Sequence, residues 1–379
     1  MNAKQINIGL LGFGSMGRTH TYAISVLPFF YRELPFASRL AGIYTRTEKT
    51  REDAKAEFGF ERAYSSEDEL INDPNIDVID ITTPNIAHYE TIKKAIAAGK
   101  NIYCEKPLCV TAAEADEVAR LARDAGVTAQ IVFNTRFLSP ILRAKQLIDE
   151  GRLGRIISFR SSYLHASCTD LEKAAGWKQD KTVCGGGVLF DLGSHALDLI
   201  YYLCGSYKRV WGMSQIAHPT RLGMDGKPWQ TNADEAFYML CELECGAKGT
   251  VEANKLAVGA NDDFKLEIYG ERGALRFDLM EPNWLWFYDM TDKTGDLGGE
   301  RGFKRIECCG RYPAPAGIFP GVKAPIGWLR GHLGSMYSFL SAVAGADQTG
   351  PDFTDAAHIQ RVMEAAYESD RDGHVVDII

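Results

Sequence analysis

Residues 6–17 read INIGLLGFGSMG, and this stretch decides the fold of the first part of the chain. Residues 6–11 form a short apolar run, as expected of a parallel strand buried on both faces. A glycine loop follows, and a helical pattern starts near Arg18. The loop consists of Gly12, Phe13, Gly14, Ser15, Met16 and Gly17. A G-x-G-x-x-G loop between a strand and a helix predicts a dinucleotide site; the alternative is a glycine-rich turn without a ligand.

The three glycines have separate tasks in such a loop. Gly12 permits the tight turn, Gly14 lets the backbone approach a pyrophosphate, and Gly17 allows close packing of helix against strand. The N-terminus of the helix then directs its unpaired N–H groups at the phosphates. The loop is therefore predicted to bind the phosphates of NAD or NADP.

Alternating strand and helix patterns continue to about residue 135. Thr111 and Glu114 form a capping box that starts one of the helices. Strands are predicted at residues 39–44, 76–81, 101–104 and 127–133, and helices at residues 87–98 and 111–125. This order predicts an α/β Rossmann domain, a doubly wound parallel sheet, over residues 1–135.

The end of the second strand bears on the choice between NAD and NADP. An acidic residue usually stands there and accepts hydrogen bonds from the ribose 2′-hydroxyl of NAD. This chain has Thr45, which cannot repel a 2′-phosphate, followed by Arg46, which could pair with one. The pattern favours NADP slightly; the alternative places Arg46 beside the adenine or in solvent.

Two further segments carry side chains suited to chemistry on an alcohol. Lys106 follows the strand at 101–104, at the carboxyl edge where open α/β sheets bind ligands; a surface lysine is the alternative. Asp191 and His195 lie four residues apart in a helical pattern after the glycines at 185–187. A carboxylate beside an imidazole suits general-base catalysis, although a structural Asp–His pair would have the same spacing.

Four stretches together resemble the Gfo/Idh/MocA family, named for glucose–fructose oxidoreductase and inositol dehydrogenase. They are GFGSMG at 12–17, TTPNIAHYE at 82–90, CEKP at 104–107 and GGGVLFDLGSHALDL at 185–199. The resemblance implies hydride transfer between a polyol carbon and nicotinamide, with Lys106 and His195 at the reacting oxygen and Asp191 positioning the substrate or the histidine. It also implies that the nicotinamide ribose is lined by Thr82, Thr83, Pro84, Asn85, His88 and Glu105, and that Lys106 contacts the cofactor as well as the substrate.

The second domain is predicted to span residues 136–379 and to be α+β with a large, mostly antiparallel open-faced sheet. Its strands are expected at 155–165, 235–244, 249–255, 264–270 and 274–279, and its helices at 333–344 and 356–369. Residues 290–327, rich in Gly and Pro, are expected to form a loop over the substrate or a neighbouring subunit, or a passive surface loop. Weaker candidates for cofactor or substrate contact, with core or interdomain packing as equal rivals, are Asn134, Arg136, Trp177 and Lys178. Tyr163 and His165 end the strand at 155–165, so one of them could point to the substrate, although a role on the sheet surface is favoured.

Charge and composition narrow the class of protein. The net charge is −8 without a basic run, which argues against nucleic acid as a partner. The N-terminus lacks a signal-peptide pattern and no run approaches about 18 apolar residues, so we expect a soluble, cytoplasmic protein without a membrane partner. The nine cysteines are expected to be reduced. No metal site is predicted; a zinc site at Cys241 and Cys245 is a minor alternative because a second pair is missing.

The residues and the resemblance together predict an NAD(P)-dependent oxidoreductase acting on a secondary alcohol of a sugar, glycoside or cyclitol. The family resemblance also implies a homodimer or homotetramer formed through the second sheet. Two alternatives are a glycosidase that uses transient oxidation by a bound cofactor, and a non-catalytic sugar sensor. The acid/base set argues against the sensor. No role is predicted for His20, His218, His332, His358 or His374, because none has a partner pattern.

Overall fold

The computed structural model describes residues 3–309, 313–316, 324–325 and 327–379. The chain divides into two compact units. The first unit comprises Met1–Phe137 and Leu329–Gln360, with the described part of Pro313–Gly321. The second unit comprises Leu138–Tyr312 and Arg361–Ile379, with the described part of Val322–Trp328. The expected division at residue 135 differs from these units, because residues 329–360 pack with the first unit rather than the second.

The sheet of the first unit has six parallel strands in the order β3-β2-β1-β4-β5-β6. The strand order reverses at β1 and β4, and ligands of such sheets bind at the carboxyl ends of the strands at this point. The strands are β1 (Lys4–Leu11), β2 (Phe36–Tyr44), β3 (Arg62–Ala63), β4 (Val78–Ile81), β5 (Asn101–Cys104) and β6 (Ala129–Ile131). The prediction of a doubly wound Rossmann sheet is confirmed.

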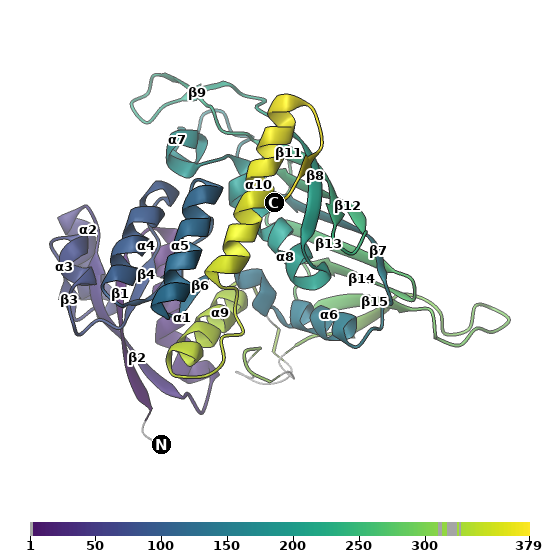
Figure 1. The fold of residues 1–379 in the computed structure, drawn as a ribbon, viewed down its shortest axis with the longest axis horizontal. Coiled ribbons are helices and arrows are strands. Elements are labelled where there is room, and N and C mark those ends of the chain that lie inside the picture. The colour runs from purple at the N-terminus through teal and green to yellow at the C-terminus, as the bar shows by residue number, and fades with distance from the viewer. Residues whose placement is uncertain (1–2, 310–312, 317–323, 326) are drawn as a thin grey trace. The chain divides into compact units, whose positions relative to one another are not determined.

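Helices cover this sheet, and local sequence signals explain their ends (Figure 1). The capping box of Thr111 and Glu114 starts α5, and Gly126, in the left-handed region at φ 66°, ends it. Side chains of α1 and α9 share one buried core with β1, including Ile8, Leu27 and Phe339. The helices are α1 (Ser15–Phe30), α2 (Glu48–Phe58), α3 (Glu67–Ile71), α4 (His88–Ala97), α5 (Ala112–Ala125) and α9 (Trp328–Val343).

The second unit is built on a nine-stranded sheet in which β7 and β12 are parallel and the other neighbours antiparallel. Its order is β16-β15-β14-β13-β7-β12-β11-β8-β17. The strands are β7 (Ile156–Leu164), β8 (Tyr207–Gln215), β11 (Ala236–Leu243), β12 (Lys248–Asn254), β13 (Asp263–Gly270), β14 (Gly273–Asp278), β15 (Trp284–Asp289), β16 (Lys304–Glu307) and β17 (Val376–Asp377). The predicted large, mostly antiparallel sheet is confirmed.

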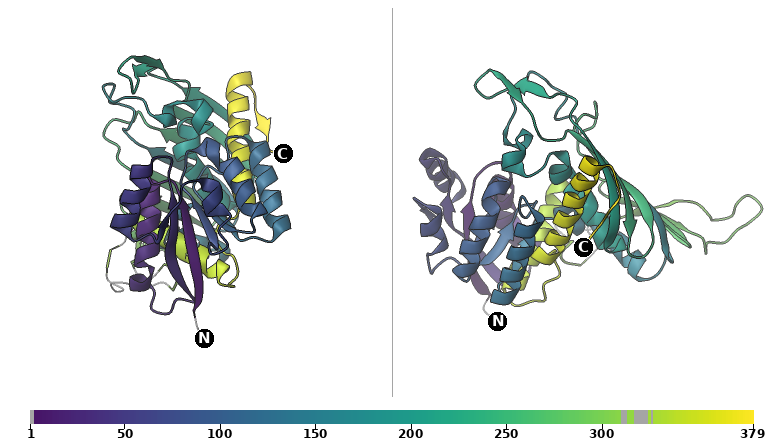
Figure 2. Two further views of the ribbon diagram at one scale, coloured as in Figure 1. Left: turned by 90° about the vertical axis from the view of Figure 1, so that its left-hand side faces the viewer. Right: turned by 45° about the horizontal axis from the view of Figure 1, so that its top comes forward.

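Helices of the second unit pack on one face of this sheet. A short hairpin is formed by β9 (Thr220–Leu222) and β10 (Pro228–Gln230). The helices are α6 (Ser139–Asp149), α7 (Lys181–Cys184), the π-helical turn η4 (Leu189–Gly193) and α8 (Ser194–Cys204); α10 (Phe353–Asp372) crosses the boundary of the two units at residues 360–361. Residues 290–303 extend away from the sheet between β15 and β16 (Figure 2). The loop predicted at 290–327 is interrupted by β16, and its residues 310–312, 317–323 and 326 lie outside the described residues.

One stretch of the second unit, Lys181–Cys204, is long and apolar enough to cross a membrane. The stretch contains Lys181, Asp191 and Asp198, so it is not a continuous apolar run. Of its most apolar window, 83% is buried inside the protein, as is usual for a core helix of a folded domain. None of the nine cysteines forms a disulfide within the described residues.

Candidate active site

The glycine loop of the first unit lies against the backbone that follows β4. Gly12 has φ 91°, and a Cβ atom on it would lie 2.9 Å from the carbonyl oxygen of Thr82. A Cβ atom on Gly17 would lie 2.8 Å from the carbonyl oxygen of Gly12. The Thr82 hydroxyl donates to the carbonyls of Leu11 and Gly12 at 3.1 and 3.2 Å. Any larger residue at Gly12 or Gly17 would push the loop off this strand end.

Gly14 faces open space, unlike its neighbours in the loop. Apart from Gly14 itself and its two chain neighbours, no described atom lies within 4 Å of a Cβ position built on it. It is the N-cap of α1, and among the described residues no side chain caps that helix. The first N–H groups of α1 are therefore available to an anion, and the helix dipole favours negative charge there. This cradle fits a dinucleotide pyrophosphate; the residues that would hold it are Gly12, Phe13, Gly14, Ser15, Met16 and Gly17.

The turn after β2 begins with Thr45 instead of an acidic residue, and two arginines lie in or next to it. The Thr45 hydroxyl donates to the carbonyl of Thr47 at 2.7 Å, and the side chain is buried. Arg51 donates to the carbonyl of Thr45 at 3.2 Å. Arg46 is exposed. The turn thus offers two guanidinium groups near the strand end, where the adenosine ribose of a dinucleotide is bound in Rossmann folds.

The segment from residue 82 to 88 is held in shape by its histidine. His88 is fully buried, and its ring nitrogens lie 2.9 Å from the carbonyl oxygen of Pro107 and 3.0 Å from that of Thr83. Burial lowers the pKa of His88. Asn85 is also buried, in the 3-10 turn that follows Pro84. The His88 side chain therefore ties two turns together and presents no surface to a ligand.

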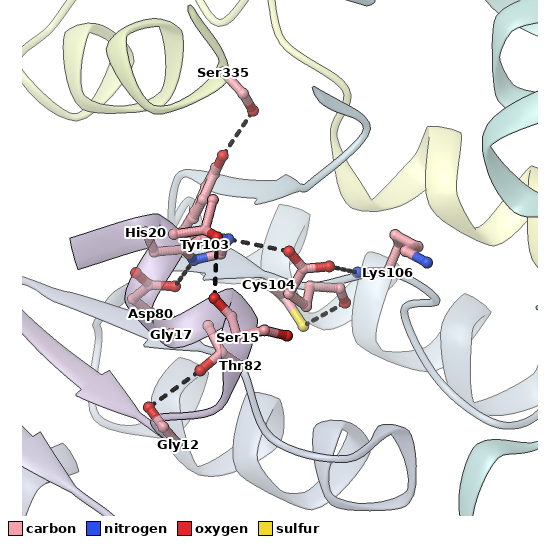
Figure 3. Close-up of polar contacts among 12 residues, drawn as sticks. Gly12, Ser15, Gly17, His20, Asp80, Thr82, Tyr103, Cys104, Lys106 and Ser335 are labelled. Carbon is pink, nitrogen blue, oxygen red and sulfur yellow. Dashed lines mark hydrogen bonds and ion pairs between the residues drawn. The ribbon is translucent and has the colours of Figure 1, made fainter. Parts of the chain in front are cut away.

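The Glu105–Lys106 turn at the end of β5 rests on a buried ion pair (Figure 3). The Glu105 carboxylate contacts Nε2 of His20 at 3.0 Å and accepts a hydrogen bond from the backbone N–H of Lys106 at 3.1 Å. Nδ1 of His20 lies 2.8 Å from the carboxylate of Asp80 on β4. Burial alone would raise the pKa of Glu105, but His20 and Lys106 outweigh it and lower the pKa to about 2. The carboxylate is therefore ionised, and Lys106 itself is half-buried.

In the second unit, the glycines at 185–187 allow η4 to approach Asp234. A Cβ atom on Gly187 would lie 2.2 Å from the carbonyl oxygen of Asp234, so only glycine fits. The Asp234 carboxylate accepts hydrogen bonds from the backbone N–H groups of Gly187 and Leu189 and from the hydroxyl of Tyr367. These contacts anchor the start of the π-helical turn that carries Asp191.

Asp191 lies between two lysines. Its carboxylate oxygens contact Nζ of Lys178 and Nζ of Lys255, each at 2.8 Å. The Lys255 side chain is 7% exposed, that of Asp191 17% and that of Lys178 46%. Burial works to lower the pKa of Lys255, but Asp191 outweighs it and raises the pKa. Asp191 is therefore a carboxylate with a buried cation on one oxygen and a partly exposed cation on the other.

His195 follows on α8 and is 8% exposed. Its ring lies 6.0 Å from the ring of Tyr163, measured between centroids. The Tyr163 hydroxyl donates to the carboxylate of Asp262 at 2.6 Å, and Nε2 of His165 lies 3.0 Å from the same oxygen. Burial works to raise the pKa of Asp262, but His165, Tyr163 and nearby His195 outweigh it and lower the pKa. An ionised carboxylate thus stands close to His195.

The weaker substrate candidates fall into two groups. Trp177 is exposed and Lys178 contacts Asp191, so both lie at the surface near this carboxylate. Tyr163 and Asn134 are buried, the latter 2% exposed. Arg136 is buried as well and pairs with Asp355 at 3.0 Å. The structure therefore assigns packing or ion-pair contacts to Asn134 and Arg136, and joins Tyr163 and His165 to the surroundings of His195.

Sequence reasoning missed His20, Lys255 and Asp262. His20 lies 60 and 85 residues from its partners, and no local pattern connects it with them. Lys255 directly follows β12, and His165 directly follows β7. Because these two strands are parallel, both residues lie at the same edge of the sheet. Because the sheet was expected to be mostly antiparallel, this shared edge could not be inferred. The signal that could have found Lys255 is a lysine next to the end of a strand.

Comparison with known proteins decides the family. Residues 6–133 match the sequence family described as the oxidoreductase family with an NAD-binding Rossmann fold. Residues 141–276 match the GFO/IDH/MocA C-terminal domain family. A scyllo-inositol 2-dehydrogenase (NADP(+)) of Bacillus subtilis is 32% identical over 98% of this chain and 95% of its own. The chain belongs to the Gfo/Idh/MocA family of oxidoreductases.

Two other comparisons within the Gfo/Idh/MocA family cover the whole chain. A levoglucosan dehydrogenase of Pseudarthrobacter phenanthrenivorans is 29% identical over 99% of this chain and 98% of its own. The structure of a levoglucosan dehydrogenase in complex with NADH and levoglucosan is 30% identical, with a TM-score of 0.93, over 99% of both chains. The protein is therefore an NAD(P)-dependent dehydrogenase that acts on sugar alcohol groups.

Proposed function

We propose that the protein oxidises a ring secondary alcohol of an anhydrosugar or a cyclitol, or reduces the corresponding ketone. The observation that carries the proposal is the set of charges around His195: an ionised Asp262 nearby, and Asp191 held between Lys178 and Lys255. This set combines a group that can take a proton with a carboxylate that can bind hydroxyl groups. The activities named for the relatives, on levoglucosan and scyllo-inositol, fit this class of substrate.

The proposed roles follow from these contacts. When bound, a nicotinamide dinucleotide supplies the hydride acceptor, and the glycine loop and the N-terminus of α1 hold its phosphates. His195 accepts the proton of the substrate hydroxyl, and the negative charge of Asp262 stabilises the imidazolium that forms. Lys106 donates a hydrogen bond to the substrate oxygen and stabilises its developing charge. Asp191 accepts a hydrogen bond from a substrate hydroxyl while its ion pairs with Lys178 and Lys255 hold the carboxylate in place.

The proposal is tested by a panel of levoglucosan, scyllo-inositol, myo-inositol and D-xylose, each with NAD and with NADP. Absorbance of the reduced nicotinamide reports turnover. We expect the highest kcat/KM with levoglucosan or an inositol. The proposal fails if only the open-chain or aldehyde form of a sugar is oxidised, because the substrate would then not be a ring secondary alcohol.

We propose a preference for NADP that depends on Arg46. A charge-assisted hydrogen bond contributes about 1.5–3 kcal/mol, which corresponds to roughly 10–100-fold in binding. Arg46→Ala should therefore raise the KM for NADP about 10–100-fold and leave the KM for NAD nearly unchanged. The matched variant Arg39→Ala removes an exposed arginine of β2 that pairs with Glu61 and should change neither constant. A wild-type enzyme that uses NAD far better than NADP would contradict this prediction.

We propose that the outer face of the nine-stranded sheet binds a second copy of this chain. Trp211, Met213 and Leu240 are exposed there, and a groove of about 660 Å³ is lined by Trp211, Leu240 and Val375. Arg160, Arg209 and Lys248 line it together with Glu242, so both signs of charge are available to a self-complementary contact. The grouping of large apolar side chains on one open face is typical of a protein interface.

Leu240→Glu should weaken the assembly, because it places a charge in the groove. Sedimentation velocity should show a dimer or tetramer for the wild type and a shift toward monomer for the variant. Met224→Glu, at an exposed residue that does not line the groove, should sediment like the wild type. A monomeric wild type would contradict the proposal.

A further inference from the structure

His20 connects three elements of the first unit through ion pairs. It lies on α1, one turn after the glycine loop, and contacts Asp80 of β4 at 2.8 Å and Glu105, directly after β5, at 3.0 Å. All three side chains are buried: His20 and Asp80 are 1% exposed and Glu105 is 8% exposed. Figure 3 shows His20 and Asp80 side by side, with Lys106 at the far end of the group.

The geometry favours a positively charged His20. Each ring nitrogen faces a carboxylate oxygen, and an ionised carboxylate can only accept hydrogen bonds. A neutral imidazole donates from one nitrogen only, so with both carboxyl groups ionised the two contacts are hydrogen bonds only if His20 is an imidazolium. Burial raises the pKa of Asp80, and His20 opposes that rise. Burial alone would lower the pKa of His20, but Asp80 and Glu105 outweigh it and raise the pKa to about 10.

No other described group next to His20 supplies a positive charge between Asp80 and Glu105. Tyr103 lies 5.2 Å away between ring centroids and donates its hydroxyl hydrogen to Ser335. His332 lies 6.1 Å away, and burial lowers its pKa to about 3, so it is neutral. Lys106 acts on the other side of Glu105, as a charge that lowers the pKa of that carboxyl. His20 is thus the cation held between Asp80 and Glu105.

We propose that His20 is a positioning residue: its imidazolium keeps Glu105 ionised and fixed against the backbone N–H of Lys106, and so orients the Lys106 side chain. The inference deepens the proposed function, because it rests on the role assigned there to Lys106. It goes beyond that function in joining the helix of the phosphate cradle to the turn of the reactive lysine through one buried cation. Without that cation two buried carboxylates would lack compensation, which is costly.

A bound metal ion is the competing interpretation of the same cluster. Donor atoms of His20, Glu105 and His332 lie within 4.8 Å of one another, a spacing that also suits metal ligands. Direct contact of both His20 nitrogens with carboxylates favours the imidazolium. Elemental analysis of the purified, catalytically active protein should find no stoichiometric zinc, iron or manganese. One tightly held equivalent that is lost in His20→Gln would overturn the proposal.

The charge of His20 can be measured without any substrate. Nitrogen NMR of the protein labelled with ¹⁵N-histidine, at a pH about two units above the ordinary histidine value near 6.5, distinguishes imidazolium from neutral rings. The resonance pair that disappears in His20→Gln should have imidazolium shifts. A neutral tautomer for that pair would overturn the proposal even if the enzyme proves active. This readout therefore separates failure of the inference from failure of the proposed function.

Kinetics test whether the charge positions Lys106. In wild type, Glu105 with a pKa of about 2 stays ionised across the working range. In His20→Gln the buried Glu105 carboxylate loses its neighbouring cation, so its pKa rises. We expect kcat to fall about tenfold or more, and kcat/KM to decrease at acid pH in a way that the wild type does not show. The double variant His20→Gln/Glu105→Gln should lack that acid loss, because the amide that replaces the carboxyl group does not titrate.

His88→Gln is the matched control. His88 is also a fully buried histidine of the first unit, but its nitrogens contact backbone carbonyls instead of carboxylates. Its substitution can lower activity or stability, yet it should not create the acid loss. A His20→Gln profile that is merely scaled down from wild type would overturn the positioning role. If His20→Gln does not fold, Asp80→Asn provides the second test, and a histidine resonance with unchanged pKa would contradict the proposal.

Discussion

His195→Asn should lower kcat by about 10²–10⁴-fold, the usual contribution of a general base. Asparagine approximates the shape of the imidazole but cannot take up the proton of the substrate hydroxyl. The affinity for reduced cofactor, measured by nicotinamide fluorescence, should stay near the wild-type value, because the proposed phosphate cradle belongs to other residues. Steady-state kinetics with the best substrate of the panel provide the rate.

His165→Asn is the matched comparison for His195. Both histidines are near the Asp262 carboxylate, and His165 contacts it at 3.0 Å. His165→Asn should reduce kcat far less than His195→Asn, because its proposed effect passes only through Asp262. Equal losses in the two variants would mean that the cluster, rather than His195, is what the reaction needs. A His195→Asn enzyme with the wild-type kcat would contradict the proton-transfer role outright.

Lys106→Met should lower kcat by about 10²–10³-fold, as expected when a donor to a charged transition state is removed. Methionine keeps the length and the apolar stem of lysine and deletes the ammonium group. Lys106 is not proposed to bind the cofactor phosphates, so the Kd for reduced cofactor should change little. Single-turnover absorbance of the reduced nicotinamide isolates the chemical step.

Lys94→Met is the control for charge removal in the same unit. Lys94 forms surface ion pairs with Glu67 and Asp68, which contribute little to stability, so this variant should match wild type. Lys106→Arg keeps the charge but differs in geometry, and should not restore full activity. Full activity of Lys106→Met would contradict the role assigned to the lysine.

The first sheet could be predicted because its signals are local. Apolar runs at residues 6–11 and 101–104 and the capping box at Thr111 each lie within one short window, and parallel connections admit few topologies. Strand β8 was missed because its outward residues include Trp211 and Met213, so the sequence lacks a clear alternation of apolar and polar positions. The apolar residues that obscured the strand pattern in the sequence lie on the face that we propose as an interface between copies of the chain.

The candidate site was predictable where function lies in short motifs, and not where it lies in pairs distant in sequence. The glycine loop, Lys106, Asp191 and His195 all stand in contiguous motifs. The partners of these residues do not: Lys255 is 64 positions from Asp191, counted as 255 minus 191, and contacts it because η4 packs against β12. Likewise, no pattern around His20 shows that it lies between two carboxylates.

The division of the chain could not be inferred from the order of its elements. The helix predicted at residues 333–344 was assigned to the second domain because it follows the second sheet in sequence. In the structure its buried side chains Leu333, Met336 and Phe339 share a core with Ile6 and Ile8 of β1. Whether a helix near the C-terminus packs against the N-terminal sheet depends on tertiary contacts, and the periodicity within the helix gives no information about them.

The central claim is direct hydride transfer from a ring carbon of a polyol to nicotinamide. The most direct test uses the best substrate of the panel deuterated at its reacting carbon, with oxidised cofactor, and mass spectrometry of the cofactor and sugar products. The account predicts one deuterium in the reduced nicotinamide for each molecule of ketone formed. Cleavage of a glycoside without net cofactor reduction, or a reduced cofactor free of deuterium, would contradict it.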